Sequence, residues 1–308
     1  MSLPLISIIV ITYNSSKSIY ETLESAKNQL YQNKELIISD DFSNDDTIKI
    51  CANWIKENQQ FFVNAELVTS AKNTGIAPNI NRGVYAAKGI WLKLIAGDDL
   101  LLTNCLTDNY NIVNEDDSIK ILFTNSITFT EINDKKVLGS KIPISTQKKL
   151  FNIDPLIQLS NLMNYKLFCP APSSFIYKKT LLDLGALDED FPFYEDFPLW
   201  LKCANSNVKL SYADIDTVLY RQGDSISRDS IRWYHELYYE SKKSHFNLSV
   251  APYLKENNKK MLFISRLYFL KFDILIKIFG NKKNFFSKSF NYIFNFIFFN
   301  EKIINKKA

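Results

Sequence analysis

One stretch of the sequence, WLKLIAGDD at residues 91–99, constrains the fold more than any other. Its mostly apolar first six residues are typical of a strand buried on both faces, as in a parallel sheet. Gly97 then lets the backbone turn, so Asp98 and Asp99 follow the carboxyl end of the strand, where open α/β sheets bind ligands. Two adjacent carboxylates repel each other unless they are neutralised. The pair therefore indicates either a divalent metal site that carries a phosphate or a solvated turn that caps the next helix.

Strands and helices alternate strictly through the first 114 residues. We expect strands at 5–11, 35–39, 65–70 and 91–96, separated by helices that begin near residues 15, 43, 78 and 103. This alternation predicts an α/β fold with a mostly parallel, doubly wound sheet. Right-handed crossovers bring the carboxyl ends of the strands to one edge, which should gather the polar residues there into one ligand site: Thr12, Tyr13, Asp40, Asp41, Asp98 and Asp99.

The sequence contains neither GxGxxG nor GxxxxGK[ST], the glycine-rich signatures that bind dinucleotides or phosphates through backbone amides. Phosphates at this edge of the sheet would therefore be held by side chains and a metal. The four cysteines lie far apart without a CxxC pair, which favours free thiols in a reducing compartment. We expect no signal peptide and no membrane-spanning helix, because the N-terminus lacks a basic region and no long uncharged apolar run is present.

The charge of the chain is divided unevenly. Residues 255–308 contain 12 Lys/Arg and 3 Asp/Glu, a net charge of +9, whereas the first 254 residues carry −5. A mildly acidic body with a basic tail suggests an anionic partner for the tail. The tail is also rich in aromatic residues, and its basic residues are too scattered to track a phosphate backbone, so we expect a membrane surface and no nucleic acid.

Several of these motifs, in this order, resemble the nucleotide-sugar glycosyltransferases of family 2, which have the GT-A fold. The segments that carry the resemblance are SIIVITYNSS, NKELIISDDFSNDDT and KNTGIAPNINRGVYAAKGIWLKLIAGDDLL. The resemblance covers residues 5–105 closely and continues to about residue 230 through GALDEDFPFYEDFPLWLKCA and YRQGDSIS. It implies a Rossmann-like sheet with an acceptor-side extension.

The resemblance also implies roles for individual residues. Thr12 and Tyr13 match the end of the first strand, where the nucleotide base stacks and forms hydrogen bonds. Either Asp40 or Asp41, with Asp41 preferred, accepts a hydrogen bond from the base. Asp98 and Asp99 match the carboxylates that bind a divalent metal, Mn²⁺ or Mg²⁺, together with the ribose and diphosphate.

Three positions depart from the pattern of the family. Ala96 occupies the first acidic position of the common DxDD form, so Asp98 and Asp99 carry the metal and ribose alone. Ile80 stands where many relatives have an arginine, and Arg82 is out of register with it. Arg221 matches an arginine that approaches the phosphates, although the usual histidine after it is absent; its alternative role is to tie down a loop.

Beyond residue 114 the regular alternation stops. We expect a strand at 119–129, a polar excursion at 131–149, a short helix at 154–164 and a strand at 175–177, which together form the acceptor half. The segment YEDFPLW, residues 194–200, contains adjacent acids among aromatic residues that would exclude water and raise the basicity of a carboxylate. It resembles the ED motif of the family, so we assign Asp196 as the general base and Glu195 as its orienting partner. The alternative is an N-cap pair for a helix at 198–204.

The tail combines dense apolar positions with a sparse polar stripe. Lys259, Arg266, Asp273 and Lys277 share one helical face, and a second segment repeats the pattern at Asn284, Lys288, Asn291, Asn295 and Lys302. Such a pattern is typical of an interfacial helix on anionic lipid. A helical hairpin packed on the body or on another subunit of a homo-oligomer is the alternative.

The sequence thus predicts a glycosyltransferase domain at 1–230, with a nucleotide-sugar half at 1–115 and an acceptor half at 116–230, and a helical tail at 231–308. We expect an inverting, metal-dependent enzyme that transfers a hexose or N-acetylhexosamine from a UDP-sugar to a lipid-linked saccharide during surface polysaccharide synthesis. Its expected location is the cytoplasmic face of the membrane. Two other hypotheses are an inactive nucleotide-sugar-binding scaffold and a sugar nucleotidyltransferase.

Overall fold

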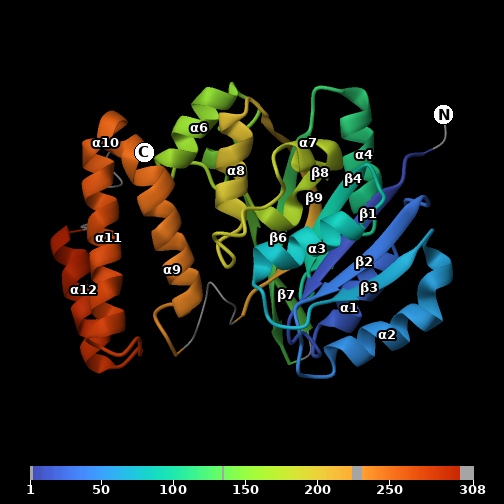
Figure 1. Ribbon diagram of the computed structural model, residues 1–308, viewed down its shortest axis with the longest axis horizontal. Coiled ribbons are helices and arrows are strands. Elements are labelled where there is room, and N and C mark those ends of the chain that lie inside the picture. The colour runs from blue at the N-terminus through green and yellow to red at the C-terminus, as the bar shows by residue number, and fades with distance from the viewer. Residues whose placement is uncertain (1–2, 134, 224–230, 299–308) are drawn as a thin grey trace. The chain divides into compact units, whose positions relative to one another are not determined.

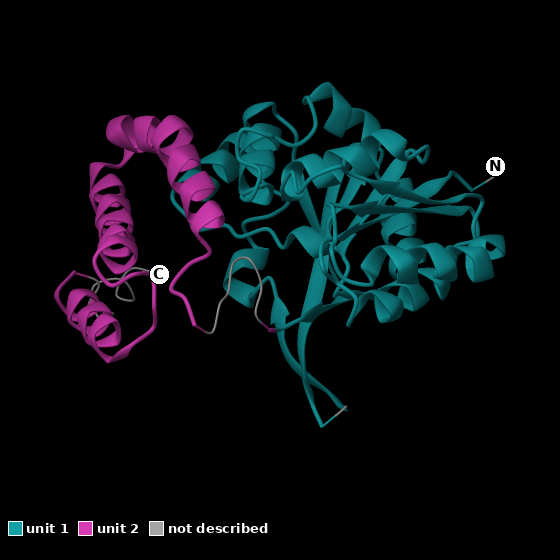
Figure 2. Cartoon of the chain, turned by 60° about the horizontal axis from the view of Figure 1, so that its bottom comes forward, with its two compact units in different colours: residues 1–222 teal, residues 223–308 magenta. Residues whose placement is uncertain are grey.

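A computed structural model describes residues 3–133, 135–223 and 231–298 (Figure 1). The chain divides into two compact units, residues 1–222 and 223–308, which are coloured separately in Figure 2. The boundary expected at residue 230 lies outside the described residues. Each unit is described below by itself.

The first unit contains a nine-stranded sheet with the order β3-β2-β1-β4-β8-β6-β9-β5 and with β7 paired to β6. The strands are β1 (Ile6–Thr12), β2 (Lys34–Asp40), β3 (Ala65–Thr69), β4 (Trp91–Ala96), β5 (Leu100–Leu101), β6 (Ile121–Ile132), β7 (Lys135–Ile142), β8 (Phe175–Tyr177) and β9 (Leu210–Arg221). The helices are α1 (Ile19–Lys27), α2 (Thr47–Asn58), α3 (Ile76–Ala86), α4 (Cys105–Glu115), α5 (Ser145–Lys148), α6 (Pro155–Met163), α7 (Lys178–Asp183) and α8 (Asp196–Asn205), with short 3₁₀ turns at Gln59–Phe61 and Ala171–Ser173.

Strands β1 to β4 pair in parallel, as the alternating sequence predicts. β8 joins this parallel half to the second half of the sheet through antiparallel pairing with both β4 and β6, and β6 and β9 are again parallel. The sheet is therefore mixed but mostly parallel, and its central strands are buried because helices cover both faces. Alternate residues of β1 illustrate this, since Ile8 packs in the core beside α1 and α2, whereas Ile9 faces Gly83 of α3.

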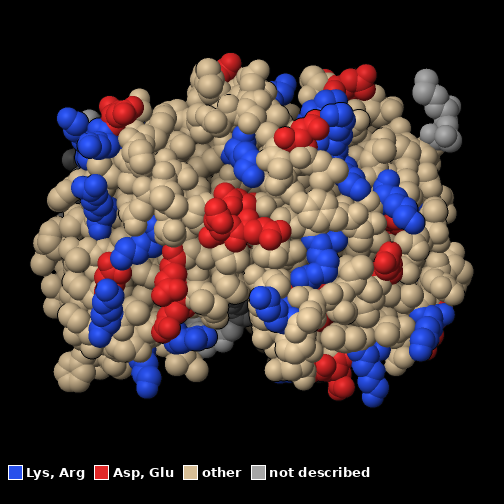
Figure 3. Space-filling view, in the orientation of Figure 1, with Lys and Arg blue, Asp and Glu red and all other residues tan. Residues whose placement is uncertain are grey.

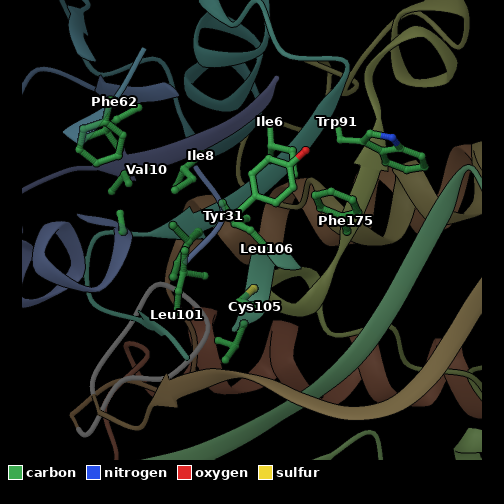
Figure 4. Close-up of a cluster of buried hydrophobic side chains, with 14 of the residues drawn as sticks. Ile6, Ile8, Val10, Tyr31, Phe62, Trp91, Leu101, Cys105, Leu106 and Phe175 are labelled. Carbon is green, nitrogen blue, oxygen red and sulfur yellow. The ribbon is translucent and has the colours of Figure 1, made fainter. Parts of the chain in front are cut away.

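The main hydrophobic core lies between the sheet and the helices α1, α2 and α4 (Figure 4). It extends from Trp54 and Phe62 at the β3 side to Trp91 and Phe175, whose rings stack with centroids 4.9 Å apart. Because Trp91 is on β4 and Phe175 on β8, this ring pair stabilises the junction between the two halves of the sheet. The four cysteines are buried as free thiols.

One sequence expectation is wrong in this unit. The range 131–149, expected to be a polar excursion, contains the end of β6, the strand β7 and the helix α5. Most of β7 is exposed, so its side chains lack the alternating apolar pattern by which a strand is recognised in a sequence. Its backbone pairing with β6, between Ser126 and Ile132, is what defines it as a strand.

The second unit is helical within its described residues. Its helices are α9 (Glu236–His245), a π-helical turn at Phe246–Val250, α10 (Ala251–Asn257), α11 (Lys259–Lys277) and α12 (Phe285–Phe298). Its interior contains a polar contact that the sequence pattern did not predict: Asp273 of α11 accepts hydrogen bonds from Tyr239 and Lys243 of α9. Among the described residues, no helix is both long enough and apolar enough to cross a membrane.

Phe175→Ala tests the junction of the two sheet halves. Phe175 is fully buried against Trp91, so truncation should lower the free energy of unfolding by about 3–5 kcal/mol. Urea denaturation of the purified protein measures this change. The matched substitution Phe61→Ala, at a side chain that is 49% exposed, should cost about 1 kcal/mol or less. Equal losses from the two variants would contradict the assignment of Phe175 to the core.

Candidate active site

The sheet register brings the polar strand ends together. Thr12 at the end of β1 is paired with Asp40 at the end of β2, and Ile11 is paired with Ala96 at the end of β4. The Thr12 hydroxyl donates a 2.8 Å hydrogen bond to Asp40 Oδ2, and both side chains are buried. The three strand ends therefore form one edge, as the crossover argument predicts, and Tyr13 lies on it with 48% of its surface exposed.

The loops after β1 and β2 hold each other in place. The backbone amide of Asn14 donates to Ser43 Oγ, and the backbone amide of Asn44 donates to the side-chain oxygen Oδ1 of Asn14. Ser43 in turn donates to Asp40 Oδ2 at 2.5 Å. Asn14 has a φ of +52°, a left-handed conformation that asparagine tolerates better than most residues. The exposed Tyr13 is thus carried on a loop whose backbone is fixed by hydrogen bonds from its neighbour.

Asp41 organises the turn that precedes α3. Its carboxylate accepts from the Thr74 amide at 2.9 Å, from the Thr74 hydroxyl at 2.6 Å and from the Gly75 amide at 2.7 Å. Arg82, one turn into α3, lies on the same cluster: its Nη2 is 3.3 Å from Asp41 Oδ1 and 3.1 Å from Thr74 Oγ1, and its Nη1 donates to Asn79 Oδ1 at 2.7 Å. Asp41 is therefore an acceptor for hydrogen bonds of the protein's own fold.

Gly75 connects this cluster to the segment that contains Pro192. Its φ is +98°, and a Cβ at this position would lie 2.7 Å from Cβ of Pro192 and 2.8 Å from the Pro192 carbonyl oxygen. That carbonyl accepts a hydrogen bond from the Ala77 amide at 3.0 Å. Only glycine meets both requirements, a left-handed backbone and close contact with the segment that leads to Glu195 and Asp196.

A second contact from α3 fixes the same segment. Asn81 is buried and donates to the Leu187 carbonyl and to Glu189, while its own oxygen accepts from the Leu187 amide. Glu195 and Asp196 follow at the start of α8, with Glu195 at the N-cap position, and the rings of their sequence neighbours Tyr194 and Phe197 contact each other with centroids 5.9 Å apart. The helix thus begins two residues before the expected Pro198, and the acids lie at its positive end.

Burial changes the acidity of Glu195. Enclosure of the carboxyl group, together with the neighbouring charge of Asp196, raises the pKa of Glu195 to about 8. A carboxyl group with this pKa is protonated at neutral pH and can donate a hydrogen bond. A protonated carboxyl group beside a second carboxyl group is an arrangement suited to proton transfer.

Asp98 and Asp99 follow β4, which lies on the other side of β1 from β2 and Asp40. They lie in a turn that Arg221 holds in place. The Arg221 amide donates to Asp99 Oδ1 at 2.9 Å, and its Nε donates to the Asp98 carbonyl oxygen at 2.8 Å. The rest of the guanidinium binds Glu21 of α1 and Glu131 of β6 at 2.7 and 2.5 Å. In this state Arg221 ties down the loop, the alternative that the sequence left open, and its charge is already paired.

The two aspartates fit a divalent cation. Asp99 is 1% exposed, and its Oδ2 has no hydrogen-bond partner among the described residues. Burial raises the pKa of both carboxyl groups, and for Asp99 the charge of Asp98 raises it further. A cation would offset this cost, and carboxylate oxygens are the ligands that Mg²⁺ and Mn²⁺ prefer. The part of the chain that the structure describes contains no cluster of three or more acidic, histidine or cysteine side chains that could hold a metal ion.

The structure therefore brings Thr12, Asp40 and Asp41 together at one edge, places Asp98, Asp99 and Arg221 beside each other, and links the first group to Glu195 and Asp196 through α3. Sequence analysis missed the residues that perform this linking. Gly75 and Asn81 were present in the quoted motif, and a glycine before a helix that follows a polar strand end is the signal that could have singled out Gly75.

Comparisons with known proteins agree with this architecture. The family model for glycosyl transferase family 2 matches residues 7–184. The glucosyltransferase WfaP of Escherichia coli, named as acting on UDP-Glc and α-D-GlcNAc-diphosphoundecaprenol, is 29% identical over 70% of this chain and 77% of its own. GlyG of Streptococcus pneumoniae is 31% identical, but over 37% of this chain and 36% of its own. The structure of S. aureus TarS 1–349 with UDP-GlcNAc superimposes with a TM-score of 0.55 at 19% identity, covering 88% of this chain and 80% of that one.

The chain belongs to glycosyl transferase family 2, because the family model matches more than half of its length. It is a glycosyltransferase, and its first unit has the mostly parallel GT-A architecture that the TarS structures share.

Gly75→Ala tests the connection between the two halves of the site. The new Cβ would push the segment that begins at Pro192 out of place, so kcat/KM for sugar transfer should fall at least about tenfold. Gly185→Ala is the matched control, since Gly185 also has a positive φ, +79°, but no atom lies within 4 Å of its added Cβ. It should lose about 1 kcal/mol of stability and keep its kcat/KM. Equal kinetic losses in the two variants would contradict the role of the Pro192 contact.

Glu195→Gln tests the raised pKa of Glu195. Because the pKa of Glu195 is about 8 in the folded protein against an ordinary 4.5, folding retains a proton. The stability that protonated Glu195 contributes to the folded state is fully present below pH 4.5 and is lost as the pH rises to 8. The variant should therefore be more stable than the wild type at pH 8.5, by on the order of 2–4 kcal/mol, with no difference of that kind for the exposed Glu57→Gln. Chemical denaturation across this pH range measures the difference, and parallel curves for wild type and Glu195→Gln would contradict the assignment.

Proposed function

We propose that this chain is an inverting glycosyltransferase that moves a hexose or N-acetylhexosamine from a UDP-sugar to a saccharide acceptor. The observation that carries the proposal is the fixed connection, through Gly75 and Ala77 of the α3 region, between the Asp41 cluster and the segment with Glu195 and Asp196. A nucleotide-sugar bound along the edge of the sheet would have its base near Thr12, Tyr13 and Asp41 and its sugar toward the acid pair.

The base would stack on the exposed ring of Tyr13. Asp41 already accepts from the Thr74 amide and hydroxyl, from the Gly75 amide and from Arg82, which is about the four hydrogen bonds that an ionised carboxylate accepts. Asp40 accepts from the Thr12 hydroxyl and from both groups of Ser43, at 2.5 to 2.8 Å. Asp41 is our candidate to read the base, because its 3.3 Å contact with Arg82 is the longest of these hydrogen bonds and the easiest to exchange.

Asp98 and Asp99 would hold a divalent cation that, when bound, withdraws charge from the departing diphosphate as a Lewis acid. The chain's own contribution is to fix the Asp99 carboxylate through the Arg221 amide and to keep water from its buried Oδ2. Arg221 adds a positive charge beside this turn, although Glu21 and Glu131 compete for it. Contact of Arg221 with the diphosphate remains a prediction that requires it to exchange these partners.

Asp196 would act as the general base. As the acceptor oxygen bonds to the anomeric carbon, Asp196 takes its proton, while the bond to the diphosphate breaks and its electron pair leaves with UDP. Protonated Glu195 would orient the acceptor or Asp196 by donating a hydrogen bond. A single displacement inverts the anomeric centre, so an α-linked donor would give a β-linked product.

The name of WfaP, a β-1,3-glucosyltransferase that acts on an undecaprenyl-linked sugar, supports a lipid-linked acceptor for this chain as well. The E. coli chondroitin synthase, 30% identical over 48% of this chain, supports a role in bacterial polysaccharide synthesis. We accordingly propose that the enzyme works peripherally at the cytoplasmic face of the membrane, where the basic helical unit would meet anionic lipid.

Two substitutions separate the proposed roles. Asp196→Asn should reduce transfer by about 10²–10⁴-fold and leave the affinity for UDP unchanged, because it removes the base and keeps the nucleotide site. Asp99→Asn should weaken both UDP binding in Mn²⁺ and transfer, because it removes a metal ligand. Released UDP, measured in a coupled assay, and calorimetric titration with UDP report the two properties.

The control for both is Asp190→Asn, an exposed acid on the same segment as Asp196. It should retain wild-type transfer and binding. Full transfer by Asp196→Asn would remove that residue as the base, and metal-independent UDP binding by the wild type would remove the metal role of Asp98 and Asp99.

A further inference from the structure

One face of α12 is apolar and turned outward. Seven residues recur along it at the spacing of a single helical stripe: Phe285, Phe286, Ser289, Tyr292, Ile293, Phe296 and Ile297, called here the outer face. Phe285, Phe286 and Tyr292 are 77, 72 and 73% exposed. Six large apolar or aromatic side chains on four turns of helix exceed the scattered exposure that soluble surfaces normally carry.

The orientation of α12 is set by contacts on its other side. Ser287 is fully buried and its hydroxyl donates to the Lys282 carbonyl oxygen at 2.6 Å. Asn295 accepts a 3.1 Å hydrogen bond from Lys271 of α11, whose ammonium group is buried. Phe294 is buried on the same side, and Phe290 contacts Phe279.

One member of the polar stripe predicted from the sequence faces inward. Asn295 forms a hydrogen bond with Lys271 of α11, whereas apolar residues occupy the outer face. Lys302, the last member of the predicted stripe, lies outside the described residues. Because six large apolar or aromatic side chains on the outer face are exposed, water is not the solvent that this face matches.

The net charge of the second unit favours one kind of partner for the outer face of α12 over another. Residues 223–308 contain 16 Lys/Arg and 7 Asp/Glu, a net charge of +9. The exposed Lys277, Lys282 and Lys288 lie at the end of α11, in the connection to α12 and in its first turns. On the face drawn in Figure 3, Lys and Arg side chains lie among uncharged residues over the second unit. A second copy would bring another +9 against this unit, whereas an anionic lipid surface attracts it, and phenylalanine and tyrosine partition well into the headgroup region.

We propose that the outer face of α12 inserts into the interface of an anionic lipid bilayer, with Lys277, Lys282 and Lys288 at the level of the lipid phosphates. This rests on the membrane location proposed above and names the element responsible, α12 in place of the tail as a whole. The helix would lie in the plane of the membrane, since its 14 residues are too short to span it.

Sedimentation with vesicles tests this inference on the full chain. Wild-type protein should bind vesicles of phosphatidylcholine and phosphatidylglycerol in equal parts and should bind pure phosphatidylcholine vesicles much more weakly. The double substitution Phe286→Gln and Phe296→Gln should reduce the partition constant at least about tenfold, because two exposed aromatic anchors are removed. Lys282→Gln with Lys288→Gln should also weaken binding, and this loss should shrink at high salt.

Two further measurements keep a failed result interpretable. Leu156→Gln, at a leucine of the first unit that is 64% exposed, should bind vesicles like the wild type. UDP release with a soluble acceptor should be unchanged in every α12 variant, so loss of lipid binding is distinguished from failure of the proposed activity. Retention of lipid binding by the phenylalanine variant would overturn the inference. So would a concentration-dependent dimer, seen by light scattering, that the same substitutions dissolve, since the outer face would then be a subunit interface.

Discussion

The close contact between Gly75 and Pro192 is the constraint on which the site depends. Gly75 donates its amide to Asp41, adopts a backbone conformation that other residues avoid, and leaves no room for a side chain against Pro192. The Asp41 cluster and the acid pair of α8 are far apart in sequence, and this contact fixes one against the other. A transfer reaction needs its two substrates held in register, and a rigid backbone contact does this with little loss of entropy at each turnover.

Electrostatics divides the site into two parts with different needs. Around Asp41, hydrogen-bond donors of Thr74 and Gly75 and the guanidinium of Arg82 surround the carboxylate. They stabilise its charge without any ligand. Around Asp98 and Asp99, burial and mutual repulsion disfavour the ionised pair, and one oxygen of Asp99 lacks a donor among the described residues. The first part is complete in the protein alone, whereas the second is suited to receive a cation with its diphosphate.

Much of this architecture could be predicted from the sequence, since alternating apolar runs define the parallel strands and the polar residues that follow them must share an edge. The convergence of Thr12, Asp40 and Asp98 is of this kind. The hairpin of β6 and β7 could not be predicted, because exposed β7 shows no apolar alternation. The contacts of Arg221 with Glu21 and Glu131 join residues up to 200 positions apart, and no local sequence pattern predicts such a pairing. The orientation of α12 also depends on a tertiary contact, that of Lys271 with Asn295.

The central claim is that these strand ends and the acid pair form one UDP-sugar site for glycosyl transfer. The most direct test is to incubate the purified chain and Mn²⁺ with a panel of UDP-hexoses and UDP-N-acetylhexosamines and a saccharide acceptor, and to measure released UDP. The account predicts UDP release from at least one donor and an inverted anomeric centre in its product. Release of inorganic diphosphate from a nucleoside triphosphate and a sugar phosphate, with no turnover of any UDP-sugar, would contradict it.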